Sequence, residues 1–409
     1  MRTFRPHTGS FRLSAALAEF AARESASGLT LLYCTVVALL WANSPWSSTY
    51  HALWHTEIGG VIPGGHAGQD VLHLINDGLM TVFFFLVGLE IKRELVTGEL
   101  ASFRTASLPV VAALGGMIVP AAIYAALNHG GPGSAGWGIP MATDIAFSLG
   151  VLALAGSGVP AGLRVFLTAF AIVDDLGAVL VIALFYSAGL SAGPLMFAAG
   201  ILALMIVLNL SGVRQGWVYL VLAVFLWFAV ASSGIHATIA GVLASFAIPL
   251  RPSTDTAPSL LVRMESRLHP WVAFAIMPLF ALANAGVTLT GNIADSFVHP
   301  VTLGVIFGLC LGKLAGLLSS SWLAVFTGLA VLPQRTSWRQ MTGVATLGGI
   351  GFTMSLFIAG LAFGNSALLA EAKVGILAGS ILSGWLGFWF LRGKDVASSD
   401  NGGNGKDED

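Results

Sequence analysis

Charged residues are scarce in this chain. Asp, Glu, Lys and Arg make up 10% of its 409 residues, whereas 56% are hydrophobic and the mean hydropathy is +0.84. A soluble domain carries roughly 25% charged residues. The shortage of charge therefore excludes a soluble globular domain, and it indicates that most of the chain lies in lipid or is covered by segments that do.

Cysteine is also rare, and there is no large excess of charge of either sign. Cys34 and Cys310, the two cysteines, lie in apolar runs and are interpreted as small core residues rather than as a disulfide or a metal-binding pair. The net charge of −1 gives no bulk attraction to nucleic acid, so no nucleic-acid partner is expected.

The two ends of the chain lack long apolar runs. The N-terminal stretch "MRTFRPHTGSFRLSAALAEFAARES" is basic and mildly amphipathic and shows no cleavable signal pattern. Residues 1–28 are therefore predicted to form a cytoplasmic tail or an interfacial helix. Residues 392–409 are polar and of low complexity, which predicts a disordered cytoplasmic tail. Residues 29–391 are predicted to form the transmembrane domain.

Between these ends the chain contains a series of apolar runs. A helix needs roughly 20 apolar residues to cross the hydrocarbon core of a bilayer. The sequence predicts an all-α, polytopic membrane protein of about 12 transmembrane helices, some of them short, at residues 29–43, 71–89, 105–127, 136–156, 163–186, 194–210, 217–231, 235–248, 271–287, 301–323, 341–363 and 374–391.

The positive charges fall in alternate gaps between these runs. Outside gaps hold only Lys373, and Lys313 lies within a run. Because cytoplasmic loops are enriched in Lys and Arg, this partition predicts an even number of crossings with both termini in the cytoplasm. The cations of the inside gaps are Lys92, Arg93, Arg104, Arg164, Arg214, Arg251, Arg263, Arg267, Arg335 and Arg339.

The longest outside gap reads "SPWSSTYHALWHTEIGGVIPGGHAGQD" and is rich in Gly, Pro, His and aromatic residues. Residues 49–57 within it fit either a short β-hairpin with Gly/Pro turns or an irregular surface loop, and the sequence favours neither.

Two adjacent aspartates, Asp174 and Asp175, lie in the apolar run "AFAIVDDLGAVLVIALFY". An ionisable residue at bilayer depth costs several kcal/mol, so it lines a cavity or is paired. Asp144 lies at similar depth, and Lys313 is the one cation there. The alternative is a purely structural arrangement, in which the lysine forms a static ion pair and a spare aspartate is only hydrogen-bonded. That arrangement predicts equal numbers of positive and negative charges at this depth. With three carboxylates and one lysine, at least one acid must hold a proton or a cation.

Two other acids lie nearer the ends of a predicted span. Asp77 and Glu90 lie near the two ends of the run at residues 71–89. Asp77 is interpreted as an interfacial carboxylate rather than as a transport residue. Glu90 precedes Lys92 and Arg93, which places it near the cytoplasmic mouth.

Two predicted spans carry signals that interrupt a helix. In "GWGIPMATDIAFSLGVLAL", Pro140 removes a backbone donor just before Thr143 and Asp144. In "VATLGGIGFTMSLFIAG", three glycines weaken a long apolar run. Either signal alone fits an ordinary packing kink, but corresponding interruptions in two triplets of spans indicate a transport site between inverted-topology repeats. There Asp144 would offset the positive ends of half-helices, and Lys313 the negative ends.

At these residues the chain resembles the NhaA family of bacterial sodium/proton antiporters, which is itself one of the families that established the rule on paired interruptions. The resemblance runs in order from about residue 71 to residue 391, through "INDGLMTVFFFLVGLEIKREL", "MATDIAFSLGVLAL", "AFAIVDDLGAVLVIALFY", "SGIHATIAGV", "LHPWVAFAIMPLFALANAGV", "GKLAGL" and "GGIGFTMSLFIA". It implies twelve helices, an inverted repeat, two crossed discontinuous helices and a location in the bacterial inner membrane.

The resemblance also implies electrogenic exchange of cytoplasmic Na⁺ or Li⁺ for external H⁺, regulated by pH, with no cofactor. By motif position, Asp175 is the cation ligand, with Asp174 and Thr143 beside it, and Asp174 is the proposed partner of Lys313. The positions that the family associates with the pH response are Glu90, His236, Glu265 and His269.

Two features of the chain depart from the family. Ser266 stands where some members have a second histidine, which affects the fine tuning of the pH response rather than the transport chemistry. In the family an outer hairpin makes the dimer contact, which implies a homodimer, but the sequence of this chain differs in that segment. Membrane lipid is the other expected partner.

Coupling is expected to follow from competition, because sodium and protons bind the same buried acids. Other classes fit less well. An intramembrane aspartyl protease needs aspartates on separate helices, a prenyltransferase needs a further acid for magnesium and diphosphate, and a channel has no need of a buried lysine. No enzyme activity is therefore expected. The alternative that remains is an ion-coupled transporter of an organic anion with a related fold.

Overall fold

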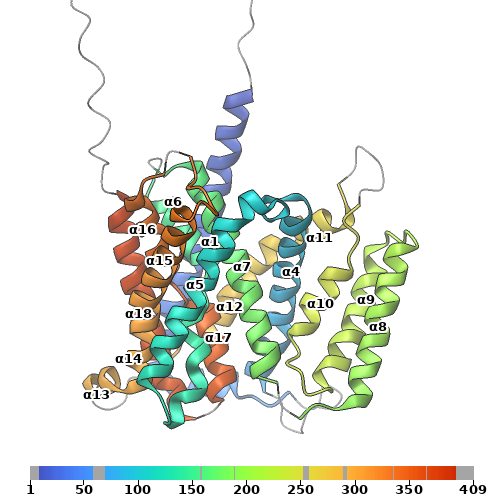
Figure 1. The fold of residues 1–409 in the computed structure, drawn as a ribbon. Helices are drawn as coiled ribbons and strands as arrows, with labels where there is room; N and C mark the ends of the chain where they lie inside the picture. The colour runs from blue at the N-terminus through green and yellow to red at the C-terminus, as the bar shows by residue number, and fades with distance from the viewer. Residues whose placement is uncertain are drawn as a thin grey trace, which may run out of the picture.

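The structure is a computed structural model that describes residues 9–58, 70–156, 159–187, 189–251, 258–288, 293–334, 336–364 and 366–392. Within these ranges every regular element is helical, and the one β-pairing is an isolated antiparallel bridge between Glu57 and Asp70. The helices form one bundle, with the start of α1 and the end of α18 at the same end (Figure 1). The all-α prediction is confirmed.

The first half of the chain forms the following elements. They are α1 (Gly9–Ala42), α2 (Ser47–Trp54), α3 (Val71–His73), η1 (Leu74–Leu79), α4 (Met80–Thr97), η2 (Glu99–Ala101), α5 (Phe103–Leu127), η3 (Pro132–Met141), α6 (Ile145–Leu154), α7 (Ala161–Phe185) and α8 (Ala192–Leu210).

The second half of the chain is also helical. Its elements are α9 (Gly216–Ala231), α10 (Ile239–Ala247), α11 (Leu260–Trp271), η4 (Val272–Ile276), α12 (Met277–Asn284), α13 (Ile293–Val298), α14 (Pro300–Phe307), η5 (Gly308–Gly312), α15 (Lys313–Phe326), α16 (Trp338–Leu347), α17 (Phe352–Phe363) and α18 (Ala367–Arg392).

Many of these helices are long and apolar enough to cross a bilayer. Among the described residues seven qualify by length and composition, or up to ten if each bent helix pair is one span, and Gly216–Ala231 is a shorter apolar helix. The chain is therefore a multi-pass membrane protein. A helix covers at least part of each predicted run, but the count of twelve crossings stays a prediction.

The segment after the first helix has neither of its two predicted forms, because it is a regular helix rather than part of a β-hairpin or an irregular loop. Residues 47–54 form the helix α2, bent by 116° from α1, instead of the first strand of a hairpin. The hydroxyl of buried Tyr50 donates to the carbonyl of Leu282 at 2.8 Å, which fixes α2 against α12. The hairpin interpretation is wrong for these residues because this buried contact favours a helix. The rest of the predicted dimer contact, at residues 59–69, lies outside the described residues.

The predicted tails fall largely outside the described part of the chain. Residues 1–8 and 393–409 are not described, so the C-terminal tail stays a prediction. α1 begins at Gly9 and runs without a break past residue 28, so the helix itself shows no boundary between the predicted tail and the first span.

The buried apolar side chains fall into two clusters. The larger one joins most of the bundle, and the smaller one joins α8, α9 and α10 to parts of α4 and α11. In Figure 1 the helices α8, α9 and α10 accordingly stand to one side of the main body. Many large apolar side chains of α8 and α9 remain exposed in the single chain, which fits contact with lipid.

Glycines allow α5 and α15 to pack at very short range. A Cβ atom added at Gly316 in α15 would lie 2.1 Å from the carbonyl oxygen of Gly115 in α5. Small residues permit such close approach of helix backbones in membranes, where packing contacts contribute much of the association energy. This contact positions α15 and therefore its first residue, Lys313.

We expect Gly316→Ala to force α5 and α15 apart and to destabilise the protein by about 1–3 kcal/mol, the usual cost of overpacking. The measurement is the thermal unfolding midpoint in detergent. Gly200→Ala in α8 is the matched control, because an added Cβ there meets no atom within 4 Å. Equal midpoints for the two variants would contradict the close contact.

Candidate functional site

The first interrupted helix consists of η3 and α6. The two helical parts meet at an angle of 47°, and residues 142–144 between them are extended. Pro140 near the end of η3 supplies no backbone N–H, which helps to end the regular hydrogen bonding. The predicted interruption before Asp144 is confirmed.

The second interrupted helix consists of α16 and α17, which meet at 43° across residues 348–351. Gly349 is needed there because an added Cβ would lie 2.3 Å from the carbonyl oxygen of Leu309. The glycines thus let another backbone approach as well as weakening the helix, and the interruption predicted from them is confirmed.

The two interruptions satisfy each other's backbone groups. The N–H of Asp144 donates to the carbonyl of Ile350 at 2.6 Å, and the Thr143 hydroxyl donates to that of Gly348 at 2.7 Å. The Ser148 hydroxyl donates to Leu347 at 3.0 Å. Backbone groups that leave a helix at bilayer depth must find partners inside the protein, and these bonds supply them. The inverted repeat and the crossing of the helices stay predictions.

Asp144 joins the positive ends of two half-helices. Its carboxylate accepts a hydrogen bond from the N–H of Phe147 in the first turn of α6 at 3.0 Å. It also accepts from the N–H of Thr353, in the first turn of α17, at 3.2 Å, and from the Thr353 hydroxyl. One negative charge therefore offsets two helix dipoles, as the sequence predicted for Asp144.

Lys313 and Asp174 form a fully buried ion pair. The Lys313 Nζ atom lies 2.8 Å from both carboxylate oxygens of Asp174, and both side chains have an exposed fraction of 0%. Lys313 thus forms the ion pair with Asp174 that the resemblance implied, and its offset of the carbonyl ends of half-helices stays a prediction. Hydroxyls bind those carbonyls, and a carboxylate is the stronger partner for a buried ammonium group.

Asp175 has no such partner. Its side chain is 2% exposed, and among the described residues its Oδ1 atom has no hydrogen-bond partner. Neighbouring helical residues point about 100° apart, so Asp175 faces away from the Lys313–Asp174 pair. A buried oxygen with a negative charge and no donor is free to bind a proton or a cation.

Asp175 lines a cavity of about 200 Å³. Asp144 and Thr353 lie on its wall with Asp175, and Glu90 is close enough to act on Asp175 electrostatically. Arg93 also lines it, and its side chain is 37% exposed, so the cavity reaches toward the surface. The arrangement links an acid in the core to polar groups near one end of the bundle.

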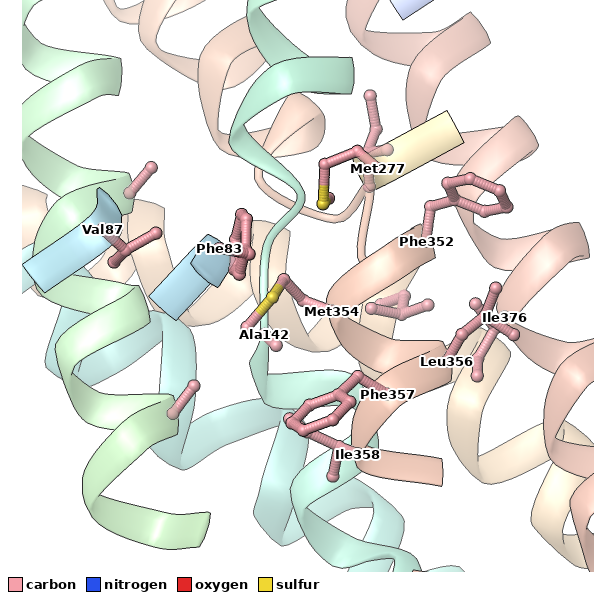
Figure 2. Close-up of a cluster of buried hydrophobic side chains, with 14 of the residues drawn as sticks. Phe83, Val87, Ala142, Met277, Phe352, Met354, Leu356, Phe357, Ile358 and Ile376 are labelled. Atoms are coloured by element: carbon pink, nitrogen blue, oxygen red, sulfur yellow. The ribbon is translucent and has the colours of Figure 1, made fainter. Parts of the chain in front are cut away.

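Apolar side chains form much of the cavity wall. They include Phe83, Val87, Met277 and Met354. Figure 2 shows these side chains around the extended stretch at Ala142, with Phe357 farther along α17. Such a wall keeps the dielectric low and strengthens the attraction of a carboxylate for a small cation.

The cavity brings together three of the four residues at positions that the resemblance links to a pH response. Glu90, Glu265 and His269 all line it, and Arg93 binds Glu265 at 3.0 Å. His236 is not among its lining residues and instead lies 3.6 Å from Asp77.

The predicted cation ligands differ in how they are engaged. Asp174 is bound by Lys313. The hydroxyl group of Thr143, which lies beside Asp174, donates to the carbonyl of Gly348. Of these three residues, Asp175 is therefore the one that offers an oxygen without a partner. The described part of the chain contains no group of three or more His, Cys, Asp or Glu residues placed to hold a metal ion.

Sequence reasoning missed Thr353, which binds Asp144 and lines the cavity. The signal was available in "GGIGFTMS": Thr353 is the second residue of the half-helix that begins after the glycines, where a free backbone N–H is expected. Arg93 was noted only as a cytoplasmic charge, because its contact with Glu265 depends on the packing of α4 against α11.

Known proteins resemble the chain along nearly its whole length. The family model described as Na⁺/H⁺ antiporter 1 matches residues 18–391. A protein named Na(+)/H(+) antiporter NhaA 2 from Pseudomonas syringae pv. syringae is 52% identical over 389 residues, which cover 95% of this chain and 97% of the relative. A protein named Na(+)/H(+) antiporter NhaA from Rhodospirillum rubrum is 51% identical, over 92% of this chain and 97% of the relative. Another protein of that name, from Oleidesulfovibrio alaskensis, is 47% identical, over 93% of this chain and 94% of the relative.

Proposed function

Because the chain belongs to the Na⁺/H⁺ antiporter 1 family, we propose that it is an electrogenic, pH-regulated antiporter that exchanges cytoplasmic Na⁺ or Li⁺ for external H⁺. Sodium/proton antiport is the activity named for its relatives. The direction, the lithium transport, the electrogenicity and the pH regulation are parts of the proposal that the site supports.

The observation that carries the proposal is the contrast between two neighbouring carboxylates. Asp174 is neutralised by Lys313, whereas Asp175 is buried, has an oxygen without a partner and lines a cavity. A buried carboxylate without a fixed counter-charge is costly unless it is protonated or binds a cation. The same atom can thus hold either ion but not both, and this competition couples the two fluxes.

The transport steps follow from this competition. At high cytoplasmic pH, Asp175 loses its proton to the cavity and binds a cation there. The half-helices that meet at Asp144 then change their packing so that the acid faces outward, where external protons displace the cation. Asp144 remains bound to both half-helices and adjusts the electric field at the site without releasing a proton.

Net charge movement requires more than one proton for each cation. Asp175 carries one proton in this scheme, and the Lys313–Asp174 pair carries the second. When a cation binds Asp175, the ammonium group of Lys313 is repelled, and Asp174 becomes available as a further ligand together with Thr143. Loss of a proton from Lys313 at that stage makes the exchange electrogenic.

The groups at the cavity mouth provide a basis for pH regulation. Glu90, Glu265 and His269 lie around the route to Asp175, and Arg93 pairs with Glu265. Protonation of these groups changes the charge that a cation meets on its way in. His236, which lies between α9 and α10 and contacts Asp77 in η1, is a separate candidate for the pH response.

The orientation follows from the basic residues. We expect Arg93 to face the cytoplasm of a bacterium. The same holds for the helix ends that carry other cations of the inside gaps, such as Arg263 and Arg339. The cavity therefore opens inward in this structure. Both termini lie in the cytoplasm in this orientation, and the membrane is the bacterial inner membrane.

The experiment that tests the proposal measures sodium-induced proton movement by purified protein in proteoliposomes. We expect Na⁺ or Li⁺ to drive proton flux and to generate a membrane potential, and K⁺ to have little effect. Uptake of organic anions, the alternative activity, is measured in the same vesicles. Anion uptake without cation-driven proton flux would overturn the proposal, and three acids facing one lysine argue against that outcome.

A further inference from the structure

A second group of titratable side chains lies at the other end of the bundle. Asp77 is placed between two imidazoles: His73 Nε2 lies 3.2 Å from Asp77 Oδ2, and His236 Nε2 lies 3.6 Å from Asp77 Oδ1. Asp77 precedes Glu90 by 13 residues of the helical segment Val71–Thr97. At 1.5 Å per residue the two acids are about 20 Å apart, so this group lies toward the outer side in the proposed orientation.

Exposure falls steadily along this group. The side chain of His73 is 48% exposed, that of Asp77 is 17% exposed and that of His236 is 15% exposed. The Nδ1 atom of His236 lies 2.9 Å from the hydroxyl oxygen of Thr238, which fixes the ring. The three side chains therefore form a path of polar contacts from solvent to the half-buried interior.

The imidazole of His236, the most buried of the three side chains, contacts a layer of aromatic rings that lies between it and the site of the buried aspartates. The ring of His236 meets that of Phe357 edge-on, with centroids 5.5 Å apart, and Phe84 packs on Phe357 at 5.5 Å. Phe357 lies one turn after Thr353, which binds Asp144. In Figure 2, Phe357 lies along α17 from Met354, which lines the cavity. A single aromatic layer thus separates His236 from the elements of the site.

The composition of the group suits proton transfer better than static pairing. A structural carboxylate needs one fixed cation, but Asp77 faces two imidazoles through its two different oxygens. Imidazole both accepts and donates a proton and titrates near neutral pH. Asp77 and His73 are also the titratable groups that act on His236 electrostatically, so its charge depends on theirs.

We propose that His73, Asp77 and His236 form a proton relay that carries external protons toward the aspartates of the cation site. This proposal gives Asp77 a part in transport, whereas the sequence indicated only an interfacial carboxylate. The inference rests on the proposed function, since it names the route of the proton in that exchange. His73 takes a proton from water and passes its Nε2 proton to Asp77 Oδ2. The carboxyl group turns and gives the proton to His236 Nε2, which releases it inward when the aromatic layer opens. His73 is then left with its remaining proton on Nδ1 and regains its Nε2–H form by exchange with water, while Asp77 and His236 return to their starting protonation.

The test compares His73→Gln with His55→Gln in right-side-out proteoliposomes with a weakly buffered outer solution. His55 is the matched control because it is a half-exposed imidazole in the same region, bound to Asp70 at 2.7 Å instead of to Asp77. Exchange by His73→Gln at alkaline outer pH is expected to be about a hundredfold slower, at the low end of proton-transfer effects. The KM for Na⁺ stays unchanged, and His55→Gln matches the unmodified chain.

Chemical rescue separates a relay from a structural role. Imidazole added to the outer solution is expected to restore the rate of His73→Gln, because a diffusible base replaces the missing side chain. An unaffected rate in His73→Gln, or a slow rate that imidazole does not restore, overturns the relay and leaves the antiport proposal standing. Absence of sodium-driven proton movement in the unmodified chain overturns both.

Discussion

Asp175→Asn is expected to abolish sodium-dependent proton movement while leaving a folded, membrane-inserted protein. The asparagine keeps the shape of the side chain but cannot bind a proton and carries no charge. Loss of a charged ligand group costs about 3 kcal/mol, which corresponds to an affinity for the cation about a hundredfold weaker. The measurement is the sodium-induced pH change in proteoliposomes, together with the elution profile and thermal unfolding midpoint of the purified variant.

The structure also predicts that this substitution spares stability. The Asp175 Oδ1 atom has no hydrogen-bond partner among the described residues, so removing its charge breaks no observed contact at that atom. Asp295→Asn is the matched control, because Asp295 is an exposed acid in the short helix α13, and normal exchange is expected there. Normal exchange by Asp175→Asn itself would remove Asp175 from the cation site.

Lys313→Met is expected to produce the largest loss of stability. The substitution leaves the carboxylate of Asp174 fully buried without its cation, and breaking a buried pair in this way costs about 3–5 kcal/mol. The side chain of methionine fills much of the space of the lysine stem, so the effect reports the lost charge rather than a cavity. The measurement is the thermal unfolding midpoint in detergent.

A double substitution provides the control for this prediction. Lys313→Met combined with Asp174→Asn removes both charges, so most of the lost stability is expected to return. If Lys313→Met alone keeps the midpoint of the unmodified chain, Asp174 is protonated in its absence or is reached by water, and the fixed pair contributes little. Asp175→Asn, which leaves the pair intact, is expected to keep its midpoint in the same assay.

The sequence identified the charged site because charge is so scarce in it. In a chain with 10% charged residues, Asp144, Asp174, Asp175 and Lys313 stand out within apolar runs, and their imbalance alone indicates exchangeable ions. Pro140 and the glycines around Gly349 marked both interruptions, because each changes what the local backbone can do. Membrane embedding and helical class followed from local composition, since lipid leaves few alternatives to a helix.

Pairing and access depended on contacts between residues far apart in the chain. The resemblance implied that Lys313 would pair with Asp174 and leave Asp175 for the cation, but residue chemistry alone did not determine this choice, because it depends on contacts such as the close approach of α5 and α15 at Gly115 and Gly316. The short helix α2 replaced a possible hairpin for a similar reason, since Tyr50 bonds to Leu282.

Local chemistry thus determined which residues are costly to bury and where the helices break, because both properties belong to single residues and their neighbours. Apart from the pairing that the resemblance implied, only the tertiary structure decided which acid is neutralised, which one faces the cavity, and that Asp77 lies between His73 and His236. These outcomes depend on distances of a few ångströms between separate helices, and electrostatic interaction in a low-dielectric interior changes steeply over such distances.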